Sequence, residues 1–167
     1  MNNLKEKAII LGITALVFGG IVWLATPSTK ISSGADVSNT VSKILVTQEN
    51  KYNFGAISMA AGKVTHVFAF KNSDSEPLTV STVYTSCMCT AATLIIDGVR
   101  KGPFGMPGHG FLPKLSEVVA PGAEIQVEVV FDPAAHGPAG IGSIARTVAM
   151  ETSSGVAEMS FSATVTP

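Results

Sequence analysis

The chain has 167 residues, of which 46% are hydrophobic and 14% are charged, and its formal net charge at pH 7 is −1. This length allows one domain plus appendages, and the composition is apolar for a soluble protein. The part from Lys30 onward carries 9 Lys or Arg residues and 11 acidic residues. Proteins that bind nucleic acid carry a basic face or stripe, so we expect no nucleic-acid partner.

An uncharged apolar segment near the N-terminus predicts a membrane anchor. Residues 8–25 contain no charge over 18 residues. As a helix they span about 27 Å, close to the thickness of the hydrocarbon core of a bilayer. Lys5 and Lys7 precede this segment, whereas Lys30 is the only early positive charge after it. Because positive flanking residues stay in the cytoplasm, we expect a single-pass protein with its N-terminus in the cytoplasm and the rest of the chain outside.

The same segment has two alternative interpretations, a cleaved signal peptide and a buried core helix. Signal peptides share the basic start, but their apolar region is normally shorter and ends in a small-x-small cleavage site. Trp23 is bulky where such a site needs a small residue. We therefore favour a cytoplasmic stub and uncleaved anchor within residues 1–26. Residues 27–41 are rich in Ser, Thr and Gly, which is typical of a flexible linker.

The remaining residues, 42–167, are predicted to form one all-β domain. The clearest strands cover residues 64–70, 124–131 and 157–165, where apolar side chains alternate with polar ones. Weaker candidates cover residues 43–47, 52–58, 78–86, 92–97 and 144–152. The pattern predicts an antiparallel β-sandwich. His66 shares the apolar face of its strand, and we interpret it as a packing residue at the edge of the core.

Two segments do not fit a minimal sandwich. Residues 98–113 carry five glycines and three prolines, and residues 132–142 carry three glycines and two prolines. We predict that neither segment forms a regular strand. Both hold apolar or ligand-capable side chains, including Met106, His109 and His136, so we expect ordered loops.

Both cysteines of the chain lie two residues apart, at Cys87 and Cys89, in a segment that reads as β-strand. Proteins outside the cytoplasm usually join distant cysteines, and no distant partner exists here. In an extended strand the two Cα atoms would be about 6.5 to 7 Å apart, at or beyond the limit of disulfide geometry. The pair is therefore a pair of packed thiols, a strained disulfide across a local bend, or a two-sulfur ligand set.

The ligand hypothesis adds three side chains from the two loops. Two thiolates, a thioether and imidazoles suit monovalent copper or zinc. We therefore name Cys87, Cys89, Met106, His109 and His136 as candidate metal ligands. The alternative is that the cysteines are small buried hydrophobes, that both histidines are ordinary loop residues and that Met106 packs its loop onto the sandwich.

Several motifs occur in the order found in one bacterial family. They are YNFGAI at residues 52–57, HVFAFKN at 66–72, EPL at 76–78, YTSCMCT at 84–90, APG at 120–122 and FDP at 131–133. Over roughly residues 42–166 the chain thereby resembles the family called domain of unknown function 1573 (DUF1573). The resemblance implies an exported, tethered immunoglobulin-like sandwich, related to Hydin-type modules, and implies no activity. Met88 replaces the glycine usual between the cysteines, which makes a tight bend there less favourable.

Together these observations predict a non-enzymatic module at the cell envelope. The sequence has no nucleophile elbow, no phosphate-binding glycine loop and no paired carboxylates in distinct settings. We expect an immunoglobulin-like domain anchored in the bacterial inner membrane, facing the periplasm or the extracellular space, with an envelope protein as its partner. The alternative is an envelope protein that binds copper or zinc, or performs thiol redox chemistry, through Cys87 and Cys89.

Overall fold

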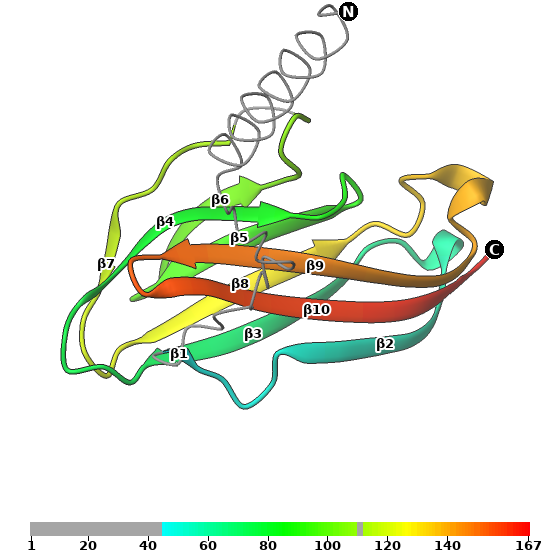
Figure 1. Cartoon of the computed structure of the whole chain (residues 1–167). Coiled ribbons are helices and arrows are strands. Elements are labelled where there is room, and N and C mark those ends of the chain that lie inside the picture. Colours follow the sequence, from blue (N-terminus) through cyan, green and yellow to red (C-terminus); the bar gives the residue numbers. More distant parts are fainter. Residues whose placement is uncertain (1–44, 110–111) are drawn as a thin grey trace, which may run out of the picture. The chain divides into compact units, whose positions relative to one another are not determined.

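The computed structural model describes residues 45–109 and 112–167, which form an all-β unit (Figure 1). Its strands are β1 (Leu45–Val46), β2 (Lys51–Ser58), β3 (Val64–Asn72), β4 (Leu78–Thr85), β5 (Thr90–Ile96), β6 (Val99–Phe104), β7 (Glu117–Val119), β8 (Glu124–Phe131), β9 (Gly142–Thr152) and β10 (Gly155–Thr166). Two short 3-10 helices, η1 (Met59–Ala61) and η2 (Gly137–Gly140), lie in connections between strands. The predicted all-β class is confirmed.

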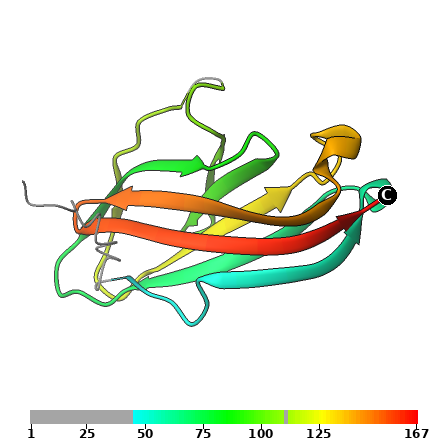
Figure 2. The ribbon, with the colours of Figure 1, turned by 45° about the vertical axis from the view of Figure 1, so that its right-hand side comes forward.

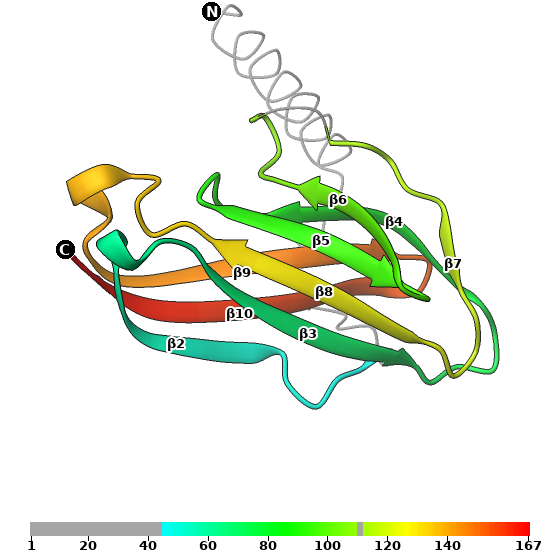
Figure 3. The same cartoon turned by 180° about the vertical axis from the view of Figure 1, so that it is seen from behind.

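The strands form two sheets, one with the order β1-β3-β8-β5-β6 and the other with the order β2-β10-β9-β4-β7. The two sheets lie in separate layers (Figure 2), and the view from behind has the first sheet in front (Figure 3). Neighbouring strands run antiparallel except for the parallel pair of β2 and β10. The predicted antiparallel arrangement is wrong for that pair. Parallel pairing needs a long connection, and nearly the whole domain separates these two strands.

Alternation along the strands produces the core between the sheets. In β8 the side chains of Ile125, Val127, Val129 and Phe131 are buried, whereas Glu124 is exposed. The apolar set of β10, from Ala157 to Val165, is buried in the same alternating way. These two strands match the expectation closely, because a half-buried strand shows its buried face as a period of two in the sequence.

His66 belongs to a cluster of aromatic side chains at one edge of the core. Its ring stacks on Tyr52, with 3.6 Å between ring centroids and 11° between planes. Its edge contact with Phe68 has a centroid distance of 4.7 Å. Nε2 lies 3.2 Å from a carboxylate oxygen of Glu49, without the alignment of a hydrogen bond. The interpretation of His66 as a packing residue is confirmed.

The prediction that residues 98–113 contain no regular strand is wrong for their first part, which forms β6. The tight turn between β5 and β6 has Asp97 at φ 50° and Gly98 at φ 78°. Asp-Gly with both residues at positive φ is a favoured two-residue hairpin turn, a local signal that the prediction from the glycine and proline content did not use. Pro103 is tolerated because β6 is the edge strand of its sheet.

Asn72, at the end of β3, is a fully buried polar residue that fastens neighbouring segments together. Its amide nitrogen donates to the carbonyl oxygens of Glu76 and Val119, each at 3.1 Å, and lies 3.3 Å from that of Ala120. Its Oδ1 accepts the backbone N–H of Asp74 at 3.1 Å. The side chain of Asn72 thereby holds the end of β7 against the end of β3.

The predicted anchor at residues 8–25 and the predicted linker at residues 27–41 lie outside the described residues. Within the described part of the chain, no helix is long and apolar enough to cross a bilayer. Anchoring therefore stays a prediction from the sequence.

Candidate functional site

Cys87 and Cys89 lie on a turn between β4 and β5, so the prediction that they belong to a strand is wrong. The N–H of Thr90 donates to the carbonyl oxygen of Cys87 at 3.1 Å, which closes the turn. The buried hydroxyl of Thr85 lies 3.0 Å from the same carbonyl and 3.2 Å from that of Thr90, within reach of both. The turn brings the two cysteine Cα atoms to 5.2 Å, well inside disulfide range.

The two sulfurs are joined in a disulfide, which is one of the three states that the sequence left open. Both cysteines are buried, with Cys87 9% and Cys89 3% exposed, but neither is a free thiol. Met88 points outward and is 57% exposed. Asp97 is the one described non-glycine residue at positive φ, so the bend does not need glycine at position 88. The expectation that Met88 disfavours a tight bend is wrong for this reason.

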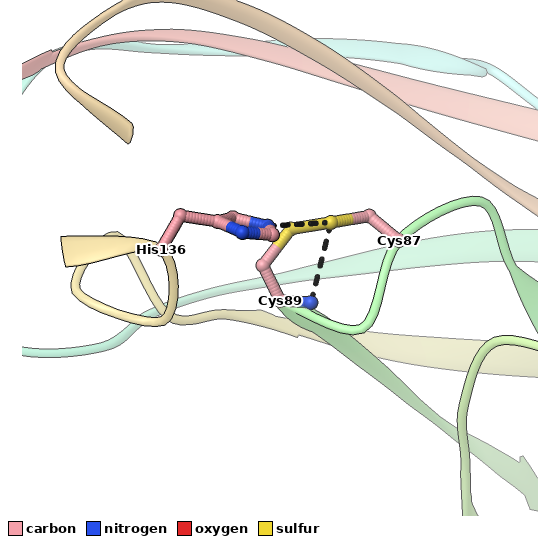
Figure 4. Close-up of side chains that lie close together, drawn as sticks. All are labelled: Cys87, Cys89 and His136. Atoms are coloured by element: carbon pink, nitrogen blue, oxygen red, sulfur yellow. Dashed lines mark hydrogen bonds between the residues drawn. A yellow bond between two sulfur atoms is a disulfide. The ribbon is translucent and has the colours of Figure 1, made fainter. Parts of the chain in front are cut away.

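Each sulfur has polar partners from elsewhere in the fold. Cys87 Sγ lies 3.2 Å from His136 Nε2 and 3.3 Å from the backbone nitrogen of Cys89. Figure 4 shows these contacts, with the imidazole directed at the disulfide. Arg146 Nε donates toward Cys89 Sγ at 3.4 Å, and Thr90 Oγ1 lies 3.7 Å from the same sulfur. Cys87 is therefore beside an imidazole, and Cys89 is beside a permanent positive charge.

The loop that follows β8 positions His136. The N–H of Asp132 donates to the carbonyl oxygen of Cys89 at 2.9 Å, which ties the loop to the cysteine turn. Asp132 Oδ1 then accepts the N–H of Ala134 at 2.9 Å, so the loop bends back at once. Gly140 packs against His136, because a Cβ at that glycine would lie 3.3 Å from the histidine Cβ. Substituting Gly140 would therefore displace His136.

A cleft of about 580 Å³ opens next to the disulfide. Its lining residues are Ser86, Cys87, Met88, Met106, His109, His136, Ala145 and Arg146. Cys89 instead faces a smaller hollow that includes Lys63 and Asp132. An incoming group in the larger cleft therefore meets Cys87 first.

The structure brings the five candidate ligands to one end of the domain in two groups. The donor atoms of Cys87, Cys89 and His136 all lie within 4.8 Å of one another. Met106 and His109 line the same cleft, and a backbone hydrogen bond of 3.2 Å joins them. In the disulfide state the two sulfurs are not a pair of thiolates, so the ligand hypothesis concerns the reduced protein.

Arg146 was not among the residues that the sequence singled out. It lies on β9, 57 positions after Cys89. Nothing in the local pattern of residues 144–152 distinguishes this arginine from a solvated charge. The nearness of Arg146 to the cysteines becomes visible only when β9 is placed beside β4, where the register pairs Val148 with Thr85.

Comparisons with known proteins include one solved structure with a fold likeness strong enough to use. No curated protein matches the chain. A protein of unknown function from Porphyromonas gingivalis W83 is similar in structure, with a TM-score of 0.52, 14% identity, and coverage of 74% of this chain and 48% of that one. This chain therefore spans about half of that protein's length. The likeness supports the two-sheet fold.

Two further structures show weaker likeness. The secreted serine protease VesC from Vibrio cholerae has a TM-score of 0.48 and 14% identity, with coverage of 75% of this chain and 24% of that chain. The ASH/PapD-like domain 7 of human CEP192 has a TM-score of 0.45 and 9% identity, with coverage of 74% and 85%. The family model described as "Protein of unknown function (DUF1573)" matches residues 45–105. These residues include β1 to β6 and the cysteine turn, so the resemblance to DUF1573 that the motifs predict is confirmed over this segment.

Proposed function

We propose that this protein is an immunoglobulin-like module that is anchored in the bacterial inner membrane and binds or supports a partner protein at the cell envelope. The uncharged residues 8–25 and the preceding Lys5 and Lys7 support the anchor and its orientation. The proposal includes no enzymatic activity and places the β domain outside the cytoplasm.

The cleft beside the disulfide is the part of the domain that we assign to the partner. The observation that carries this assignment is the exposed Met88 on its lining, which also includes Met106. Thioether side chains are flexible and apolar, and they recur at surfaces that bind other proteins. The cleft also offers the imidazole of His136 and the guanidinium of Arg146 for polar contacts.

Site-specific photo-crosslinking in the native envelope tests this assignment. A photo-reactive amino acid replaces Met88 in one strain and Val118 on β7 in another. The two side chains are matched because Met88 is 57% and Val118 is 61% exposed. We expect a discrete crosslinked protein only from position 88. Equal products from both positions, or products only from position 118, would remove the cleft from the proposal.

The disulfide and its neighbours favour a second candidate function, thiol–disulfide exchange. A thiolate of a partner protein would attack Cys87 Sγ from the cleft. The Cys87–Cys89 bond would break, and its electron pair would leave on Cys89 Sγ beside Arg146. A second partner thiolate would then attack the partner sulfur of the mixed disulfide and release the Cys87 thiolate beside His136. The partner dithiol would end oxidised and the cysteine pair reduced, with two protons taken up by the two thiolates.

The charge on Arg146 gives this candidate a specific test. A nearby cation stabilises a leaving thiolate, so Arg146→Gln should slow reduction of the disulfide by a dithiol. Arg100→Gln is the control, because Arg100 is an exposed arginine of β6 that pairs with Glu128 instead. Stopped-flow measurement of thiol release compares the two rates. Equal rates for both variants and the parent protein would argue against exchange chemistry at this pair.

A further inference from the structure

The cysteine turn and the loop after β8 bring together three donor atoms of a kind that binds soft metals. The two sulfurs and His136 Nε2 lie within 4.8 Å of one another. The backbone already presents them together, because the turn fixes the cysteine Cα atoms 5.2 Å apart and the loop tied to Cys89 by Asp132 carries the histidine. Reduction would therefore free two thiolates beside an imidazole without rearranging the main chain.

We propose that reduction of the Cys87–Cys89 disulfide converts this turn into a binding site for monovalent copper, with Cys87 Sγ, Cys89 Sγ and His136 Nε2 as ligands. The proposal rests on the second candidate function, because both require that a dithiol can reduce the Cys87–Cys89 disulfide. A dithiol supplies the electrons, so that its two S–H groups become a disulfide while the cysteine pair becomes two thiols. Binding of one cuprous ion then displaces the two thiol protons. The disulfide form lacks thiolates and does not bind the ion.

The kind and number of donors favour monovalent copper over other metals. Thiolate and thioether ligands select cuprous copper, zinc and iron–sulfur clusters, whereas magnesium, calcium and manganese prefer oxygen. Zinc in structural sites takes four protein ligands, whereas the two cysteines and His136 supply three. Met106 lines the cleft next to these donors but is not one of the three proposed ligands.

The charge around the donors also fits a cuprous site. Two thiolates and one cuprous ion carry a net charge of −1. His136 is exposed, but Cys89 is only 3% exposed, and a charge at its sulfur would be unfavourable if it stood alone. Arg146 Nε is 3.4 Å from Cys89 Sγ and supplies the opposite charge. The backbone N–H of Cys89 also points at Cys87 Sγ, at 3.3 Å, and stabilises a thiolate there.

Titration of the full-length protein in detergent, without oxygen, tests the proposal. The first step counts free thiols after treatment with dithiothreitol and its removal. The second step measures competition for cuprous ion against a chromophoric chelator, for the reduced and the disulfide forms. We expect one cuprous ion per reduced chain and none per disulfide chain. X-ray absorption at the copper edge should show two sulfur ligands and one nitrogen ligand.

Two histidine variants separate the ligand from the rest of the fold. His136→Gln should weaken cuprous binding by at least about tenfold, since loss even of a supporting residue typically has that effect. It should also remove the nitrogen ligand and leave both sulfurs. His66→Gln is the matched control, because His66 lies in the aromatic cluster with Tyr52. Its affinity for copper should equal that of the parent protein.

Several outcomes would overturn the proposal. Free thiols that appear on reduction but bind no copper would refute the metal site while leaving thiol exchange intact. A pair that no dithiol reduces would refute both. Tighter binding of zinc than of cuprous copper in the same competition would refute the choice of metal. A nitrogen ligand that persists in His136→Gln would refute His136 as a ligand.

Discussion

Truncating Phe131 tests whether β8 is the central strand of the core. Phe131 ends β8, is 3% exposed, and packs its ring against Phe161 of β10 with 5.4 Å between centroids. It pairs with Val64 on one side and with Thr90 on the other, so the surrounding backbone has little freedom to collapse into a cavity. Burying a phenylalanine removes about 150 to 250 Å² from water. Phe131→Ala should therefore lower the free energy of unfolding by about 3 to 5 kcal/mol.

The matched control is Glu128→Ala on the opposite face of the same strand. Its side chain is 24% exposed and pairs with Arg100 on β6. Ion pairs at the surface contribute about 0.2 to 1 kcal/mol, so Glu128→Ala should lower the free energy of unfolding by no more than that. Both variants keep β8 as a strand, because alanine removes no backbone hydrogen bond.

Chemical denaturation of the purified variants measures both changes under identical conditions. In thermal unfolding, each kcal/mol corresponds to about 2 to 8 °C over domains of 60 to 250 residues, so Phe131→Ala should melt at least about 6 °C below the parent protein. Equal losses for Phe131→Ala and Glu128→Ala would refute the assignment of faces. A loss below about 1 kcal/mol for Phe131→Ala would show that the ring is not packed as described.

Three further outcomes are expected. Asn72→Ala removes the amide that donates to the buried carbonyl of Val119 and to the part-buried carbonyl of Glu76. It should destabilise the domain by about 1 to 3 kcal/mol in the same denaturation assay, and no change would mean that water replaces the amide. Cys87 and Cys89 should resist alkylation by iodoacetamide, followed by mass spectrometry, until a dithiol is added, and alkylation without reductant would contradict the disulfide. Residues 8–25 should keep the protein with membranes during alkaline carbonate washing, and a soluble mature protein starting near residue 26 would rule the anchor out.

Local periodicity was enough to predict the strands that form the centre of the core. In β8 and β10 every second side chain is buried, and that alternation is written directly in the sequence. It also placed His66 correctly, because its neighbours at even positions in β3 are Phe68 and Phe70. Burial in these strands could be predicted because successive side chains of a strand point to opposite faces, a rule that needs only a few neighbouring residues.

The cysteine turn could not be predicted in the same way. Its residues have small side chains and favour β structure, so their pattern predicts a continuation of β4. The bend depends instead on the buried Thr85 hydroxyl and on the link from Asp132 to the Cys89 carbonyl. His136 and Arg146 meet the sulfurs across 49 and 57 positions of sequence. Such contacts follow from strand order and register, which the pattern of a single sequence does not specify.

The position of β10 has a consequence for when the domain can fold. β10 is flanked by β2 and β9, and Ser58 Oγ at the end of β2 donates to the Pro167 carbonyl oxygen across 109 positions. Synthesis proceeds from the N-terminus, so β2 has no partner in its sheet until residues 155–166 have been made. Pairings of such long range form slowly. We propose that the chain is exported. The delay would then keep the chain unfolded while it passes through a translocation channel, and the sheet would close only after the chain has crossed the membrane.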